Sequence, residues 1–187
     1  MRIIAGDFRG RRLAGLGKGD AGAQLRPTSD RVRESLFNVL AGRDDVRMDG
    51  ARVLDVFAGT GALGLEALSR GAGRAVFIEN GRTALALLQR NIALCGAEEA
   101  CRILRRDARH PGAPPGPPHD LVFLDPPYGK GMGEVALAAL FKGGWIAGGA
   151  TVIWEEGAEI DPPDGLHLLV SRRYGETCIN LLRLAGG

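Results

Sequence analysis

Two short motifs in this sequence combine residue types that could do chemistry. The first is a glycine-rich run over residues 53–61, VLDVFAGTG, at the end of an apolar segment. Glycines at such a place let the backbone approach a ligand and expose amide groups at the start of a helix. The second motif, Asp125-Pro126-Pro127-Tyr128, follows another apolar segment. It offers a carboxylate, a stiffened backbone carbonyl and an aromatic ring, which together suit an amino group on a flat ring.

The glycine motif by itself has two interpretations. Gly59-x-Gly61-x-x-Gly64 is also a dinucleotide fingerprint, and Glu79 follows at the distance expected for an acid that binds ribose. Asp55, four residues before Gly59, is foreign to that interpretation because a carboxylate there would repel phosphate groups. The same carboxylate could pair with an ammonium group. S-adenosylmethionine carries such a group, two free ribose hydroxyls and no phosphate.

The elements that must position these motifs alternate along the chain from residue 52. Strands are expected over residues 52–57, 75–79, 102–107, 120–125 and 150–155, and helices over residues 62–70, 82–95 and 134–141. This alternation predicts an α/β fold, a mostly parallel sheet with helices on both faces. Residues 166–171 and 177–184 are strand-like and separated by a turn, which predicts a closing antiparallel pair.

The N-terminal part of the chain has a different pattern. Residues 1–15 predict a hairpin, and a helix is expected to begin near Ser29. Residues 1–33 carry eight basic and three acidic groups, a balance of +5, whereas the other 154 residues balance to −3. A basic arm on a mildly acidic body is expected where one end of a protein meets a polyanion. We therefore expect an N-terminal extension over residues 1–41 and a catalytic domain over residues 42–187.

Composition argues against several other classes of protein. No apolar run approaches the ~20 residues that cross a bilayer, and residues 1–7 lack the features of a secretory signal. Three scattered cysteines and three isolated histidines disfavour a disulfide framework and a zinc site. We expect a cytoplasmic protein that is monomeric, needs no metal and does not contact a membrane.

Taken together, the two motifs resemble those of class I methyltransferases that act on planar amino groups. Asp55-x-Phe57-x-Gly59-x-Gly61 resembles their glycine motif, and residues 125–128 resemble their (Asp/Asn)-Pro-Pro-(Tyr/Phe) motif. Further likeness in residues 2–6, 9–11, 26–34 and 53–70 makes the chain similar to the RsmD family. The resemblance covers nearly the whole chain and loosens in residues 14–24, 111–118 and the last dozen.

The resemblance implies an activity and a fold. Members of the RsmD family use S-adenosylmethionine to methylate the 2-amino group of one guanine in bacterial 16S ribosomal RNA. The implied fold is Rossmann-like, with a mostly parallel seven-stranded sheet and an antiparallel C-terminal strand pair. The implied partner is 16S rRNA, within the small ribosomal subunit or an assembly intermediate.

The same resemblance implies roles for individual residues. The cofactor would be bound by Asp55, Phe57, Gly59, Gly61, Glu79, Asp107 and Ala108. Glu79 would accept from the ribose hydroxyls, and Asp107 with the Ala108 amide would meet the adenine. The carboxylate of Asp125 and the carbonyl of Pro126 would accept from the target amino group, while Pro127 stiffens the loop and Tyr128 stacks on the base. Asn91, inside an expected helix, would brace the loop at residues 125–128.

The basic arm would bind the RNA strand. The residues expected to contact phosphates are Arg9, Arg11, Arg12, Arg26, Arg31 and Arg33. Some of these arginines could instead pin the arm to the catalytic body.

Four other functions remain open. An adenine 6-amino methyltransferase acting on RNA or DNA shares both motifs, although about 50 N-terminal residues are too few for a separate DNA-reading domain. A protein-glutamine methyltransferase uses the same loop, with Asn more typical than Asp at its first position. A nicotinamide-dependent oxidoreductase would leave Asp55 and residues 125–128 unexplained. A catalytically silent RNA-binding module would explain only the arm.

Overall fold

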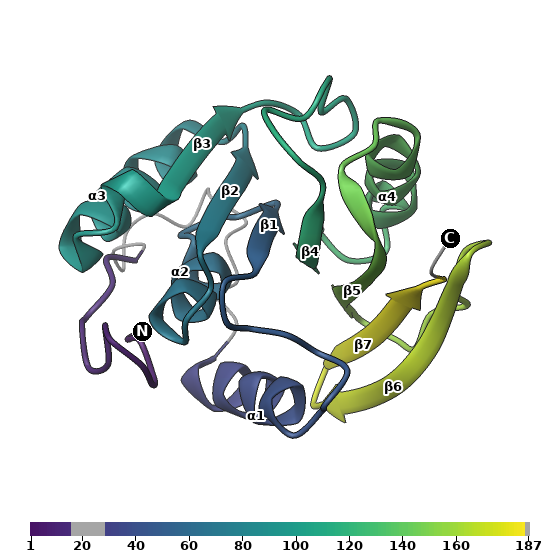
Figure 1. Cartoon of the computed structure of the whole chain (residues 1–187), viewed down its shortest axis with the longest axis horizontal. Coiled ribbons are helices and arrows are strands. Elements are labelled where there is room, and N and C mark those ends of the chain that lie inside the picture. The colour runs from purple at the N-terminus through teal and green to yellow at the C-terminus, as the bar shows by residue number, and fades with distance from the viewer. Residues whose placement is uncertain (16–28, 186–187) are drawn as a thin grey trace.

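A computed structural model describes residues 1–15 and 29–185 and places seven strands in one sheet. Their order is β3-β2-β1-β4-β5-β7-β6 (Figure 1). Their bounds are Arg52–Val56 for β1, Arg74–Glu79 for β2, Cys101–Arg105 for β3, His119–Leu124 for β4, Ile146–Glu156 for β5, Leu166–Tyr174 for β6 and Thr177–Leu184 for β7. Strands β1 to β5 pair in parallel, and β7 is antiparallel to both β5 and β6. The predicted fold class, with its antiparallel C-terminal pair, is confirmed.

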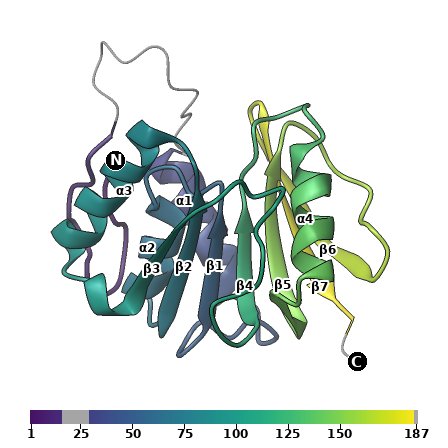
Figure 2. The same ribbon diagram turned by 90° about the horizontal axis from the view of Figure 1, so that it is seen from above.

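Helices cover both faces of this sheet (Figure 2). Their bounds are Asp30–Ala41 for α1, Ala62–Ser69 for α2, Arg82–Cys95 for α3 and Met132–Lys142 for α4, with a 3-10 turn at Glu98–Ala100. Apolar residues of α1, α2 and α3 share one buried cluster with the N-terminal arm and one sheet face. The apolar side of α4 joins a second cluster on the other face, around Trp145 and Trp154. Central strands buried on both faces explain why β1 and β4 appear in the sequence as almost unbroken apolar runs.

Most elements lie within a few residues of their predicted positions, and β6 differs for a physical reason. The apolar pattern ends at Ser171, but the strand continues through Arg172 and Arg173 to Tyr174. Strand β6 is at the edge of the sheet, where side chains reach solvent and charged residues are tolerated.

Across the described residues, no helix is long and apolar enough to span a bilayer.

The N-terminal arm, residues 1–15, is built into the body of the protein. The predicted hairpin is present as a turn closed by one antiparallel bridge between Arg2 and Arg12. The fully buried carboxylate of Glu66 on α2 accepts from the backbone amides of Ile4 (2.8 Å) and Ala5 (3.1 Å). The Ser69 hydroxyl, also on α2, accepts a hydrogen bond from the Phe8 amide of the arm (2.9 Å). The boundary between residues 41 and 42 therefore stays a prediction, since both sides contribute to one core.

The structure contradicts the predicted contact between Arg33 and RNA. Its side chain is fully buried and donates to the carbonyl of Arg2 (2.8 Å) and to the carboxylate of Asp30 (2.6 Å). Burial lowers the pKa of Arg33, against the opposing effect of Asp30. A guanidinium enclosed in this way is not accessible to a phosphate. Arg33 instead fastens the first residues of the arm to α1.

Candidate active site

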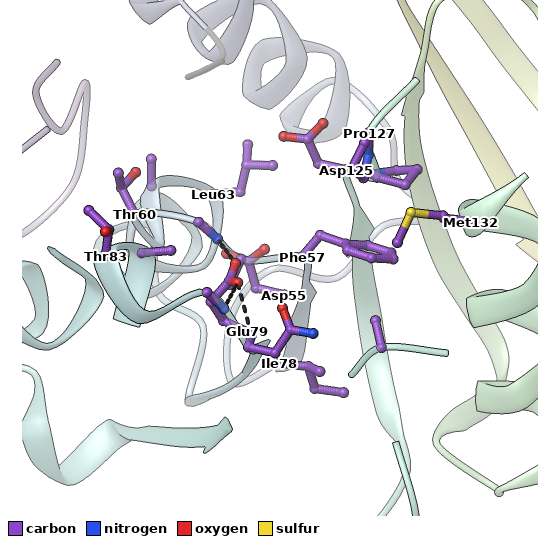
Figure 3. Close-up of a pocket in the computed structure, with 18 of the residues that line it drawn as sticks. Asp55, Phe57, Thr60, Leu63, Ile78, Glu79, Thr83, Asp125, Pro127 and Met132 are labelled. Atoms are coloured by element: carbon purple, nitrogen blue, oxygen red, sulfur yellow. Dashed lines mark hydrogen bonds between the residues drawn. The ribbon is translucent and has the colours of Figure 1, made fainter. Parts of the chain in front are cut away.

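A cavity of about 950 Å3 opens at the carboxyl ends of β1, β2 and β4 (Figure 3). This is the position where open α/β sheets bind ligands. Its walls include Asp55, Phe57, Gly59, Glu79, Asp107, Ala108, Asp125, Pro126, Pro127 and Tyr128. The structure therefore brings together ten of the eleven residues predicted to bind cofactor or target base. Gly61 lies behind the cavity wall, where any side chain would collide with Leu88 of α3.

The glycine motif turns sharply out of β1 because three of its residues have a left-handed backbone. The φ angles are +59° at Phe57, +55° at Gly59 and +76° at Gly61. This conformation costs a glycine little, but at a bulky residue such as Phe57 it stores strain of about 1–3 kcal/mol. The Phe57 ring extends into the cavity, on the side where Pro127 and Met132 lie (Figure 3). The sequence did not reveal this strain, which is of the kind that functional sites retain.

Glu79 fixes the shape of the glycine motif. One oxygen of its carboxylate accepts from the Gly59 amide (2.8 Å), and the other accepts from the amides of Asn80 (2.9 Å) and Gly81 (2.7 Å). The carboxylate thus ties the motif to the residues that begin α3. Because an ionised carboxylate has about four acceptor positions, Glu79 keeps acceptor capacity on the cavity wall.

Asp55 lies at the base of the cavity and is 2% exposed. Its Oδ2 accepts from the Gly64 amide of α2 at 2.9 Å. Burial raises the pKa of Asp55 to about 8, the Gly64 hydrogen bond opposes this shift, and the charge of Glu79 adds to it. A cation placed beside Asp55 would favour its ionised form.

Replacing Asp55 by Asn should change how stability depends on pH. The pKa of Asp55 is about 8 in the folded protein, above the ~3.9 of an unfolded chain. Between these values the folded state binds more protons, so its stability is full at low pH and falls as pH rises toward 8. Asp55→Asn lacks this titration. Its free energy of unfolding, relative to that of the wild type, should therefore rise by about 1 kcal/mol or more between about pH 5 and about pH 8. Urea unfolding at the two pH values measures this, and parallel pH curves for both proteins would contradict it.

The loop at residues 125–128 is held by two strands that the sequence did not connect with it. The Tyr128 hydroxyl donates to the buried carboxylate of Glu155 on β5 (2.6 Å) and lies 3.0 Å from the hydroxyl of Thr177 on β7. Burial raises the pKa of Tyr128, and the hydrogen bond to Glu155 raises it further. Glu155 lies near the carboxyl end of the apolar strand β5, at the same sheet edge as Asp125. This position in the sequence could have identified Glu155 as a partner of the loop.

Asp125 itself combines burial with like charges. The desolvation of its carboxyl raises the pKa well above the usual range, and the negative charges of Glu155, Asp55 and Glu156 add to this effect. A carboxyl group with a raised pKa is a stronger proton acceptor once ionised.

Asp107 and Ala108 line the cavity as predicted, but Asp107 is already paired. Its carboxylate forms a bidentate ion pair with Arg109, with a closest distance of 2.6 Å, and accepts from the Arg109 amide. The hydrogen bonds from Arg109 lower the pKa of Asp107 to about 2. Its contact with adenine stays a prediction.

Asn91 has a different role from the predicted one. It is fully buried on α3 and donates to the carbonyls of Thr60 (2.9 Å) and Ala14 (3.1 Å), while it accepts from the Ala14 amide (2.7 Å). It therefore braces the glycine motif and the arm rather than the loop at residues 125–128. The reason is topological, since α3 connects β2 to β3 and the loop at residues 125–128 follows β4.

Asn91→Leu should lower the free energy of unfolding by about 3 kcal/mol. The change leaves the Thr60 carbonyl and both backbone groups of Ala14 without these partners, and each unsatisfied buried group costs about 1–3 kcal/mol. Gln89→Leu, on an exposed position of the same helix, is the matched control and should change stability by less than about 0.5 kcal/mol. Equal losses in both variants would contradict the role of Asn91.

The predicted RNA-binding arginines are not gathered at the cavity. Arg9 and Arg12 are exposed on the arm, and Arg11 donates to the carbonyl of Leu94 (2.9 Å) in the last turn of α3. Because α3 begins at the cavity and has 14 residues, its last turn lies about 20 Å away. Arg31 is exposed on α1, and Arg26 lies outside the described residues. RNA contacts by these residues stay predictions.

Comparison with curated proteins finds relatives over most of the chain. "Ribosomal RNA small subunit methyltransferase D" of Escherichia coli (strain K12) is 44% identical over 159 residues, 85% of this chain and 76% of the relative. The Haemophilus influenzae protein of the same name is 39% identical over 166 residues, 87% of this chain and 81% of the relative.

Comparison with solved structures also finds matches over most of the chain. The structure described as "Putative methyltransferase yhhF from Escherichia coli" has a TM-score of 0.84 at 38% identity, and the match covers 100% of this chain and 99% of that chain. An RNA methyltransferase from Salinibacter ruber in complex with S-adenosyl-L-homocysteine shares the fold, with a TM-score of 0.61 at 13% identity over 85% of this chain and 94% of its own. The family model described as conserved hypothetical protein 95 matches residues 1–183. The chain therefore belongs to this family, the RsmD family of methyltransferases that its motifs resemble.

Proposed function

We propose that this protein methylates the exocyclic 2-amino group of a guanine in 16S ribosomal RNA, with S-adenosylmethionine as methyl donor. One observation carries the proposal: the glycine motif and the loop at residues 125–128, 70 positions apart in sequence, line the same cavity. Its volume of about 950 Å3 is within the range of small-molecule sites. The relatives named "Ribosomal RNA small subunit methyltransferase D" support the choice of substrate.

The residues of the cavity fit the proposed cofactor. Glu79 and the buried Asp55 are carboxyl groups, which suit ribose hydroxyls and an ammonium group but not the phosphates of a dinucleotide. Asp107 and Ala108 also line the cavity, and we assign the Asp107 carboxylate and the Ala108 backbone to the adenine. When bound, the cofactor supplies a methyl group already activated by a positively charged sulfur.

The loop at residues 125–128 prepares the nucleophile. An exocyclic amino group is weakly nucleophilic because its lone pair is delocalised into the ring. Acceptance of its hydrogens by the Asp125 carboxylate and the Pro126 carbonyl directs that lone pair toward the methyl group. The amino group loses a proton as the new N–C bond forms and the S–C bond breaks, and Asp125, with its raised pKa, accepts that proton. Tyr128 offers its ring to the base, a contact worth ~1–3 kcal/mol.

The experiment that tests the proposal uses the purified protein. It is incubated with 16S rRNA and with S-adenosylmethionine that carries an isotopically labelled methyl group. The RNA is then digested to nucleosides and analysed by mass spectrometry. Labelled N2-methylguanosine supports the proposal. Labelled N6-methyladenosine would replace it by the adenine alternative, and unlabelled RNA would overturn it.

A further inference from the structure

A groove lined by arginines lies between α1 and β6, outside the cavity. Its volume is about 560 Å3, and its walls include Arg31, Glu34, Asn38, Arg43, Val170 and Arg172. Arg43 is ion-paired with Asp45 at 2.8 Å. Arg31 and Arg172 are exposed, and neither has an ion pair or side-chain hydrogen bond with another residue in the part of the chain that the structure describes. Two guanidiniums with no such partner among residues 1–15 and 29–185 are therefore placed to bind an anion in this groove.

The groove is connected to the active-site loop through the turn between β6 and β7. The hydroxyls of Ser35 on α1 and Tyr174 at the end of β6 are 2.6 Å apart, and Figure 1 shows this end of β6 beside α1. Tyr174 pairs across the turn with Thr177, whose hydroxyl contacts that of Tyr128 at 3.0 Å. Three consecutive contacts thus lead from Tyr128, which is proposed to stack on the target base, to Ser35 on the wall of the groove.

The two free arginines flank the contact between Ser35 and Tyr174. Arg31 precedes Ser35 by four residues, so the two share one face of α1. Arg172 precedes Tyr174 by two residues, which places it on the same face of β6 about 7 Å along the strand. Arg11 of the arm, by contrast, bonds to the last turn of α3, at the far end of that helix from the cavity.

We propose that this groove binds the phosphate backbone of the RNA next to the target base, with Arg31 and Arg172 as the phosphate contacts. The inference rests on the proposed function, because it assumes that the substrate is RNA. Guanidinium groups bind phosphate through paired, charge-assisted hydrogen bonds. A strand that presents its base to Tyr128 and runs past the turn between β6 and β7 reaches this groove, where Arg31 and Arg172 line an open path.

The test compares double variants that each remove two exposed arginines. Arg31→Ala with Arg172→Ala removes the two proposed phosphate contacts from the groove. Arg47→Ala with Arg74→Ala removes the same charge near the amino ends of β1 and β2, opposite the cavity. Arg9→Ala with Arg12→Ala removes it from the arm. Binding of a 16S rRNA transcript is measured from about 50 to about 200 mM salt, and S-adenosylmethionine affinity and melting temperature report whether each variant is intact.

We expect the groove variant to bind RNA about tenfold more weakly and its salt slope to fall by about 1.4, because each phosphate of a single strand that is no longer neutralised accounts for about 0.7. The Arg47 and Arg74 control should match the wild type. Arg31→Lys with Arg172→Lys should restore the salt slope, because lysine neutralises a phosphate as a point charge, but only part of the affinity, because it cannot form the paired hydrogen bonds. A groove variant that is folded, binds cofactor and keeps wild-type RNA affinity would overturn the proposal, most directly if the arm variant alone loses affinity. Failure of the wild type to bind and methylate the transcript would instead refute the proposed function.

Discussion

Replacing Asp125 by Ala should lower the turnover number by about 100- to 1,000-fold while affinity for S-adenosylmethionine stays close to that of the wild type. Asp125 follows β4, beside β1, and its carboxyl group lines the cavity with the glycine motif. In our account it contacts only the target amino group, so its loss removes orientation and the proton acceptor together. Single-turnover rates with 16S rRNA measure the first effect, and calorimetry with the cofactor measures the second.

Asp125→Asn is the matched variant, because it keeps an acceptor oxygen but cannot take up the proton. Its turnover should lie between those of the wild type and Asp125→Ala. Wild-type turnover should rise with pH as Asp125 ionises, since desolvation and neighbouring negative charges raise the pKa of this carboxyl well above its usual range. The Asn variant should lack that rise. Equal losses of turnover and cofactor affinity in Asp125→Ala would show that the loop serves cofactor binding or folding instead.

Gly59→Val should reduce cofactor affinity by at least about 100-fold, equivalent to about 2.7 kcal/mol. The φ angle of Gly59 is +55°, a conformation that a β-branched residue adopts only under strain. Its amide also donates to Glu79, so a shift of the backbone would displace the carboxylate proposed to bind the ribose. Calorimetric titration with S-adenosylmethionine measures the change.

Gly144→Val controls for backbone strain alone. Gly144 follows α4, has a φ of +71° and has open space where a side chain would begin. Both variants should lower the melting temperature, but only Gly59→Val should lose cofactor affinity. Unchanged affinity in a folded Gly59→Val protein would show that the cofactor binds elsewhere.

The sequence was sufficient to predict the fold because its strongest signals are local. Apolar runs of five or six residues indicate strands buried on both faces, and the periodicity of residues 82–95 matches α3 from Arg82 to Cys95. The residues of the cavity could be named for the same reason, since each motif directly follows a strand. Strand ends at one sheet edge converge whatever their separation in sequence.

The sequence was insufficient where a side chain's role depends on a partner distant in the chain. Arg33 is on the expected α1, but only the folded arm shows that the carbonyl of Arg2 accepts from it. Asn91 and Glu155 bond to segments 31 and 27 residues away, and no local pattern records those pairs. Net charge was also an incomplete guide, because it does not separate buried or paired arginines from free ones.

The most direct measurement of the central claim is mass-spectrometric mapping of methylated guanine in small-subunit ribosomal RNA from a strain that lacks this gene. Our account states that one N2-methylguanosine disappears from the 16S rRNA of that strain. A plasmid copy of the wild-type gene should restore it, whereas the Asp125→Ala copy, expressed at the same level, should not. A 16S rRNA with unchanged N2-methylguanosine in the deletion strain would contradict the account.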